Sequence, residues 1–333
     1  MRNLTLTAAS LAVTLLFAVS ANAQQAETGK VIVIENEEQA VRMAAQDENI
    51  ANLRTDSARQ LSGGKYFEAL KSATKAVRET EDLYGKEHIR YANALTNLAV
   101  AQKLNNQLVK AEATLAESIK VRQSLGDLGS SMLVADMSNL GGMYITTRDY
   151  EKAQSVLNKA MNIRKGEKDL ASASVRTNLG LLAKARGQND VAERYFREAI
   201  DIKRSAIGDD SVEIAVDYNN LANLYVNDRK PEKALDLYEK ALKIKKNRYG
   251  DEHPSTAISL NNLGTAYMEA GKLDKAEQHL VKALAIRERK LQKDDVAIAD
   301  TLSNLSFVYA LTSRQAEADN AKRRAQTIYE RSM

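Results

Sequence analysis

The sequence predicts an all-α protein, a solenoid of about seven helix hairpins, and three observations predict it. The dipeptide Asn-Leu recurs six times, at spacings of 42, 39, 42, 42 and 42 residues. An alanine stands fourteen residues after each of these asparagines. Between these fixed points, apolar residues recur at the spacing of a helix face. A constant period of this length is typical of repeat proteins, in which each repeat is a small unit that stacks on its neighbours.

Residues 1–23 are expected to be a signal peptide. Arg2 is followed by an apolar run from Ala8 to Val19, and Ala21-Asn22-Ala23 forms a cleavage site of the A-x-A type. Twelve helical residues rise only about 18 Å, whereas the hydrocarbon core of a membrane is roughly 30 Å thick, so a membrane anchor is the weaker interpretation. The sequence therefore predicts export across the inner membrane into the bacterial periplasm, with no membrane span after cleavage.

Residues 24–45 precede the repeats and are expected to form an N-terminal extension or linker. They contain the run VIVIE at 31–35, which has the composition of a strand. Two interpretations stay open. The segment covers the apolar side of the first hairpin, or it adds as a strand to another protein.

The repeats fill residues 46–333. Extending the register one period upstream puts Thr55 at the asparagine position and Ala69 at the alanine position. In the repeat from Pro254, a Gly-Lys pair at 271 and 272 separates two apolar runs. The first run is Ile258, Leu263, Ala266 and Tyr267, and the second is Leu273, Ala276, Leu280, Ala283 and Leu284. Each repeat is therefore a hairpin of a helix A and a helix B, and neither helix can bury its apolar face without neighbouring hairpins.

The position nine residues before each asparagine is expected to begin helix A. It is occupied by Gln46, His88, Ser130, Asp169, Ser211, His253 and Asp295. Serine and aspartate accept hydrogen bonds from the free N–H groups of a first helical turn, and Pro254 suits that turn. Gly85, Gly208 and Gly250 stand where helix B ends. We expect His88 and His253 to act as caps, because they belong to repeats too far apart to share a metal.

These residues resemble the tetratricopeptide repeat. The signature of that family places Leu-Gly, Tyr, Ala, a bulky apolar residue and Ala where this chain has Leu263-Gly264, Tyr267, Ala276, Leu280 and Ala283. The 42-residue period and the Tyr-Gly-Asp-x-His link at 249–253 resemble the kinesin-light-chain variety. Glu288 replaces the family's proline at the end of helix B, in agreement with longer B helices. The resemblance implies a right-handed superhelix whose A helices line a concave groove.

Composition and motifs exclude several functions. After signal removal, 47 basic residues face 44 acidic ones and tryptophan is absent, which argues against a nucleic-acid partner. The chain has no cysteine and only three histidines, and it contains no Ser-His-Asp set, P-loop or HExxH motif. We therefore expect no enzyme activity, no cofactor and no metal. His279, between Glu277 and Lys282, is expected on the solvated surface.

The resemblance implies that ligands are held along the A helices, where the asparagines would form a ladder. The candidate binding residues are Asn97, Asn139, Asn178, Asn220, Asn262 and Asn304, joined by Asn219, Asn223, Asn227, Asn261, Thr265 and Glu269. One amide can pair with both the N–H and the C=O of an extended peptide. We expect a scaffold that binds an extended segment of a protein partner in the cell envelope.

Two alternatives stay open. The groove binds a small molecule or glycan, as in a ligand sensor or carrier. Otherwise each asparagine bonds to the adjoining hairpin and fixes only the stacking of the repeats.

Overall fold

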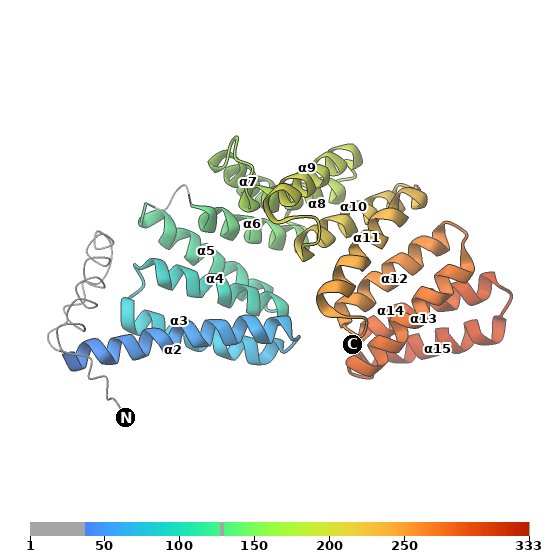
Figure 1. Ribbon diagram of the computed structural model, residues 1–333, viewed down its shortest axis with the longest axis horizontal. Coiled ribbons are helices and arrows are strands. Elements are labelled where there is room, and N and C mark those ends of the chain that lie inside the picture. Colours follow the sequence, from blue (N-terminus) through green and yellow to red (C-terminus); the bar gives the residue numbers. More distant parts are fainter. Residues whose placement is uncertain (1–36, 127–129, 333) are drawn as a thin grey trace, which may run out of the picture. The chain divides into compact units, whose positions relative to one another are not determined.

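The computed structural model describes residues 37–126 and 130–332, and all regular secondary structure in these ranges is helical (Figure 1). The predicted signal peptide and the VIVIE run lie outside the described residues. The helices, in chain order, are α2 (Glu37–Ser62), α3 (Tyr66–Tyr84), α4 (Ile89–Leu104), α5 (Leu108–Ser124), α6 (Ser131–Thr146), α7 (Tyr150–Ile163), α8 (Leu170–Ala185), α9 (Asn189–Ile207), α10 (Val212–Asn227), α11 (Pro231–Tyr249), α12 (Pro254–Glu269), α13 (Leu273–Lys290), α14 (Val296–Leu311) and α15 (Gln315–Ser332).

Consecutive helices pair into seven hairpins, from α2 with α3 to α14 with α15. The even-numbered helices are the A helices and the odd-numbered ones are the B helices (Figure 1). The predicted all-α class and the hairpin organisation are therefore confirmed.

The chain forms two compact units, Met1–Ile163 with helices α2 to α7 and Arg164–Met333 with helices α8 to α15. The boundary falls within the single 39-residue spacing, between Asn139 and Asn178. Inside each unit, a B helix packs against the A helix of the next hairpin, as α3 does against α4 and α9 against α10. Each hairpin thus covers the apolar side of its neighbour.

The small residues of the repeat let the two helices of a hairpin approach closely. The alanines fourteen residues after the asparagine are at most 3% exposed. A Cβ atom added at Gly264 would lie 2.7 Å from Cγ of Leu280, which explains why the Leu-Gly pair has no side chain at its second position. Ile258 differs from the prediction, because it is 47% exposed and lies outside the buried face of α12.

The predicted helix starts are confirmed for six of the seven repeats. His88, Ser130, Asp169, Ser211, His253 and Asp295 each accept a hydrogen bond from a backbone N–H of the following turn. Gln46 is not a cap, because α2 begins nine residues earlier, at Glu37. Gly85, Gly208 and Gly250 end B helices at φ of 78°, 80° and 86°, in the left-handed region that glycine adopts without strain.

Candidate functional site

The A helices of the second unit form a continuous row. α8 contacts α10, α10 contacts α12, and α12 contacts α14, whereas the B helices contact chiefly the A helices of their own and the adjoining hairpins. The exposed side chains of the A helices in this unit are called the A-helix face below.

The predicted ladder follows this row. Asn178, Asn220, Asn262 and Asn304 lie on α8, α10, α12 and α14, and all four are partly exposed. The amides of Asn220 and Asn262 form no side-chain hydrogen bond with the described residues. They are therefore free to donate and accept toward a ligand.

Asn304 makes contacts of a different kind. Its Nδ2 donates to Oδ1 of Asn261 and to Oγ1 of Thr265, both at 3.3 Å, and so joins α14 to α12. Thr265 also donates to the carbonyl of Asn261 at 3.0 Å, whereas Glu269 is exposed at the end of α12. This member of the ladder helps to fix the stacking of the repeats.

The predicted polar stripe of α10 is only partly at the surface. Asn219 is 8% exposed and its Nδ2 donates to the carbonyl of Ala215 at 2.8 Å. Asn223 is partly exposed and accepts from the hydroxyl of Tyr238 on α11. Asn227 is exposed. The position one residue before the ladder faces the neighbouring helices, which is why Asn219 is withdrawn from the surface.

The first unit carries two ladder residues. Asn97 on α4 is partly exposed and Asn139 on α6 is exposed. Thr55, at the equivalent place on α2, donates to the carbonyl of Ala51 at 2.9 Å.

The three histidines have structural contacts. His88 and His253 accept backbone N–H bonds through Nδ1 at 3.1 Å and stack on Tyr84 and Tyr249, with ring centroids 4.7 and 4.6 Å apart. The prediction that they cap helices is confirmed. Burial lowers the pKa of both imidazoles, so the neutral form that accepts these bonds is favoured.

His279 corrects the prediction of a solvated side chain. It is partly buried and stacks on Tyr267 at 5.4 Å, and its Nδ1 is buried without a hydrogen-bond partner. The reason is that α13 turns this position toward the tyrosine of its own hairpin. The described ranges contain no group of three or more His, Cys, Asp or Glu side chains that could hold a metal ion.

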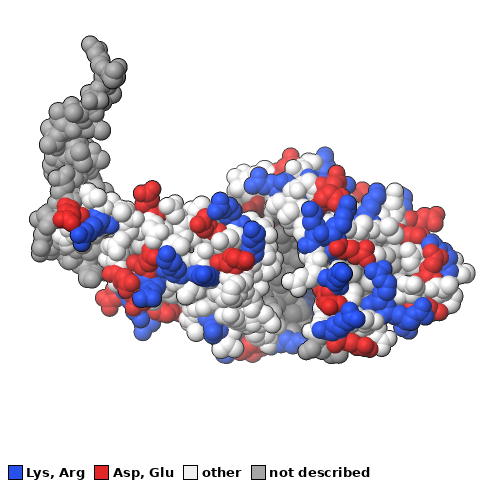
Figure 2. Space-filling model, turned by 90° about the horizontal axis from the view of Figure 1, so that it is seen from below, with Lys and Arg blue, Asp and Glu red and all other residues white. Residues whose placement is uncertain are grey.

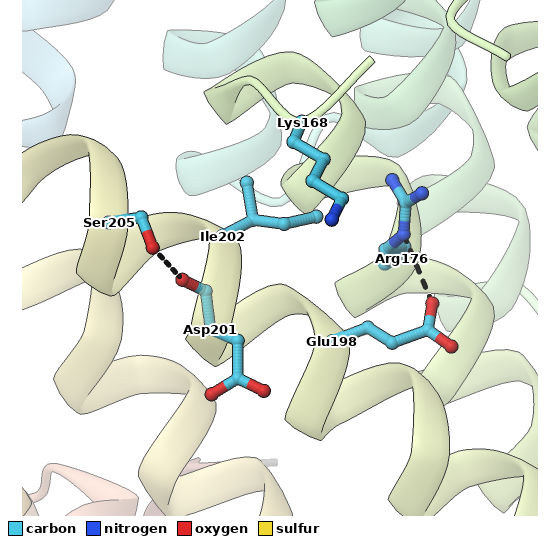
Figure 3. Close-up of a pocket in the computed structure, with 6 residues that line it drawn as sticks. All are labelled: Lys168, Arg176, Glu198, Asp201, Ile202 and Ser205. Atoms are coloured by element: carbon cyan, nitrogen blue, oxygen red, sulfur yellow. Dashed lines mark hydrogen bonds and ion pairs between the residues drawn. The ribbon is translucent and has the colours of Figure 1, made fainter. Parts of the chain in front are cut away.

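A hollow of about 350 Å³ lies beside α8 and α9 and is lined by Lys168, Arg176, Glu198, Asp201, Ile202 and Ser205 (Figure 3). Most of its polar groups are already paired. Arg176 donates to Glu198 at 3.1 Å and to the carbonyl of Ser172 at 3.0 Å, and Ser205 donates to the carbonyl of Asp201 at 3.0 Å. Lys168 is exposed and forms no ion pair or side-chain hydrogen bond with the described residues, so it is the unpaired charge that the lining of the hollow offers a ligand.

Basic and acidic side chains interleave over the face shown in Figure 2, so the charge of that face favours no single class of charged ligand. None of the helices within 37–126 and 130–332 is long and apolar enough to cross a bilayer.

The model of the tetratricopeptide repeat (TPR) family matches residues 132–205, 213–289 and 259–331, which together make up more than half of the chain. The chain belongs to the tetratricopeptide repeat family. No curated protein matches its sequence.

Several solved TPR-like structures share the fold. BtubC (BKLC) from P. vanneervenii is 25% identical, with a TM-score of 0.59 over 68% of this chain and 92% of its own. A putative kinesin light chain of Podosopora anserina with nearly identical TPR-like repeats is 19% identical, with a TM-score of 0.51 over 59% and 95% of the two chains. A Rap protein complexed with Competence and Sporulation Factor is 16% identical, with a TM-score of 0.64 over 86% and 78%.

The TPR row also exposes apolar side chains that the sequence interpretation missed. Val216 and Ile258 lie one helical turn before Asn220 and Asn262, and they are 46% and 47% exposed. They stand 42 residues apart, so the period itself contained the signal. On α14 the exposed large apolar residues are Val296, Phe307 and Leu311.

A second missed feature lies between successive TPR hairpins. A basic residue stands 25 residues after most ladder asparagines, at Arg122, Arg164, Lys203, Lys245 and Arg287. We call the place where such a residue from a B helix meets the A helices of its own and the next hairpin a polar junction. Of the junctions at Arg122, Lys203, Lys245 and Arg287, the last three lie in the second unit.

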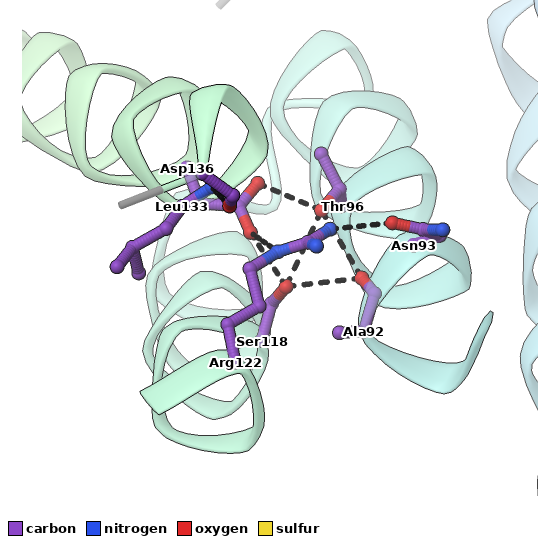
Figure 4. Close-up of polar contacts among 8 residues, drawn as sticks. Ala92, Asn93, Thr96, Ser118, Arg122, Leu133 and Asp136 are labelled. Atoms are coloured by element: carbon purple, nitrogen blue, oxygen red, sulfur yellow. Dashed lines mark hydrogen bonds and ion pairs between the residues drawn. The ribbon is translucent and has the colours of Figure 1, made fainter. Parts of the chain in front are cut away.

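The junction of α4, α5 and α6 is the most complete (Figure 4). Arg122 Nε donates to Asp136 Oδ2 at 2.9 Å, and Thr96 and Ser118 each donate to the same carboxylate at 2.7 Å. Arg122 also donates to Asn93 at 2.6 Å. Because Arg122 and Asp136 are almost fully buried, this junction fixes the register of adjacent repeats through charge-assisted bonds.

Proposed function

We propose that this TPR protein is an exported, non-catalytic scaffold that binds an extended segment of a partner protein along the A-helix face of its second unit. The observation that carries the proposal is the row of partly exposed asparagines at equivalent positions on four A helices that contact one another in succession. Because these amide groups recur at a regular spacing along the row, they suit a ligand whose hydrogen-bonding groups also recur regularly, as those of an extended peptide backbone do.

The free amides and the exposed apolar residues complement each other. Asn220 and Asn262 present a donor and an acceptor each, and Val216 and Ile258 offer apolar contact one turn away. Backbone hydrogen bonds would supply affinity, and contacts with side chains of the segment would supply specificity.

The spacing of the helices sets the length of the segment. Packed helices lie about 8–10 Å apart, so the three steps from Asn178 to Asn304 span roughly 24–30 Å. An extended chain rises about 3.3 Å per residue. The face in this unit therefore accommodates about eight or nine residues.

The comparisons support a protein ligand. The Rap structure, which shares the fold, is a complex with Competence and Sporulation Factor. The proposed location in the periplasm rests on the signal-peptide pattern of residues 1–23. Amino-terminal sequencing of the protein purified from the periplasmic fraction should begin at Gln24, and an intact Met1 would contradict export by cleavage.

The test is replacement of Asn178, Asn220 and Asn262 by alanine. We expect capture of the partner from envelope extracts to fall at least about tenfold, because each lost amide removes hydrogen bonds of roughly 0.5–1.5 kcal/mol. Stability should not fall, because alanine is the better helix former by up to about 0.7 kcal/mol per position. The measurement is affinity capture with mass spectrometry, followed by titration with eight- and nine-residue peptides from the captured protein.

The matched control replaces three exposed asparagines of B helices, Asn162, Asn247 and Asn320, by alanine. This variant should capture the partner as the wild type does. Unchanged capture by the ladder variant, together with a lower melting temperature, would instead assign the asparagines to repeat stacking, the role that Asn304 already shows.

A further inference from the structure

The charge of the buried basic residue is not neutralised in the same way at every polar junction. In the junction of α8, α9 and α10, Lys203 Nζ lies 2.5 Å from Oδ2 of Asp217 and 3.4 Å from Oγ1 of Thr177. Thr177 donates to the other carboxylate oxygen of Asp217 at 2.7 Å. A carboxylate thus compensates the buried ammonium, as Asp136 compensates Arg122 in the first unit.

The next junction, of α10, α11 and α12, has lost that carboxylate. Exactly one 42-residue period later, Lys245 takes the place of Lys203, Asn219 that of Thr177, and Ser259 that of Asp217. Lys245 is 7% exposed, Asn219 8% and Ser259 0%. Serine is shorter than aspartate by a carboxylate carbon and an oxygen, so the group that pairs with Lys203 one repeat earlier is missing beside Lys245.

Polar atoms of this junction are unpaired within the described chain. Ser259 Oγ and Asn219 Oδ1 are buried without a hydrogen-bond partner. Lys245 forms no ion pair or side-chain hydrogen bond with the described residues, and burial lowers the pKa of its ammonium with no carboxylate to oppose the shift. An uncompensated buried cation is costly, and each unpaired polar atom adds to that cost.

The following junction shows that loss of the aspartate alone does not leave a cation unpaired. There Arg287 reaches the carbonyl of Ala297 and Oγ1 of Thr301, both at 2.5 Å. A guanidinium is long enough to find these protein acceptors, whereas the shorter Lys245 has no equivalent bond. The junction at Lys245 is therefore the one of these four that lacks an acceptor for its basic group.

We propose that the junction of α10, α11 and α12 binds one small monovalent anion, of the size of chloride or formate, in the place that the Asp217 carboxylate occupies one repeat earlier. Lys245 Nζ and the hydroxyl of Ser259 donate to the anion. A second N–H of Lys245 donates to Oδ1 of Asn219, as Lys203 donates to Thr177. Every unpaired polar atom then has a partner, and the ammonium charge is neutralised.

The test measures unfolding of the full chain in urea at constant ionic strength, with chloride exchanged for isethionate, which is too large for the site. Once chloride exceeds its dissociation constant, the unfolding constant of the wild type should fall about tenfold for each tenfold rise in chloride, because one bound anion is released on unfolding. Formate in place of chloride distinguishes a general small-anion site from one selective for halide.

Ser259→Asp supplies a built-in carboxylate and should abolish the chloride dependence while stabilising the protein in isethionate. Lys245→Met should also abolish the chloride dependence. Lys243→Met, which removes the same charge from an exposed position of α11, should leave the chloride dependence unchanged. Because Lys245→Met risks misfolding, ³⁵Cl line broadening by the wild type and by Ser259→Asp gives a direct readout of binding.

Equal stability of the wild type in chloride, formate and isethionate would overturn the proposal and leave a water molecule as the occupant. Chloride dependence that persists in Ser259→Asp would overturn it as well, because the anion would then bind elsewhere.

Discussion

Replacing Asp136 by alanine tests whether the polar junctions hold successive hairpins together. The carboxylate of Asp136 is 0% exposed and accepts from Arg122, Thr96 and Ser118. Its removal takes from the buried guanidinium of Arg122, which is 1% exposed, the carboxylate that accepts from its Nε at 2.9 Å. We expect the first unit to lose a large part of its stability while the second unit keeps its own.

The magnitude follows from which groups stay paired. Thr96 and Ser118 keep the carbonyl of Ala92 as an acceptor, at 3.1 and 3.0 Å, so their loss of the carboxylate adds little. Arg122 loses the ion pair between its Nε and Oδ2 of Asp136, whose two side chains are 1% and 0% exposed. Breaking a buried ion pair at one partner costs about 3–5 kcal/mol, and that is the expected loss in the free energy of unfolding.

The assay is urea unfolding followed by circular dichroism for Asp136→Ala, Arg122→Met and the double variant. The double variant should be more stable than Asp136→Ala, because it removes the buried guanidinium together with the carboxylate that compensates its charge. Asp56→Ala, which breaks the exposed pair with Arg59 on α2 of the same unit, is the control for loss of one acidic charge. A loss below about 1 kcal/mol in Asp136→Ala, or strictly additive losses in the double variant, would refute the reasoning.

Two further predictions concern the hairpins and their caps. Gly264→Ala should destabilise the protein by about 1–2 kcal/mol, since its Cβ would meet Leu280 at 2.7 Å and the gain in helix propensity offsets only part of the overpacking; an unchanged urea midpoint would contradict this close approach. Stability should also fall as pH drops below about 6.5, the ordinary histidine value. Burial lowers the pKa of His88, His253 and His279, so the folded state binds fewer protons there than the unfolded state. Melting temperatures at pH 7.5 and 5.5 should differ less in His253→Ser, which keeps a capping oxygen, and an equal pH dependence would count against this role of His253.

The regular features of the fold were predictable because each depends on local chemistry. The period of the Asn-Leu pairs located every hairpin, and the alanine positions identified the helix contacts that are now seen to be buried. Capping residues marked six helix starts, since a side-chain acceptor beside free N–H groups is a local arrangement. The start of α2 was wrong because helix formation continues upstream of Gln46, where no repeat register applies.

The candidate site was predictable only in part. The sequence indicated which residues recur, and the A-helix row does carry Asn178, Asn220, Asn262 and Asn304. The sequence did not distinguish an exposed asparagine from a buried one at the neighbouring position. Asn219 and Asn220 differ by one residue, yet about 100° of helix rotation puts the first in a buried junction and the second at the surface.

The sequence by itself determined the seven hairpins, the start of six of them and the recurrence of the ladder, because repeats of fixed period specify their own local structure and nearest-neighbour packing. Only the tertiary structure decided how polar residues are shared between hairpins. A buried lysine on a B helix is paired with a carboxylate or lacks one according to what the next A helix places beside it. Lys203 meets Asp217 and Lys245 meets Ser259, and both lysines are 7% exposed, so one residue of the next A helix makes the difference between the two repeats.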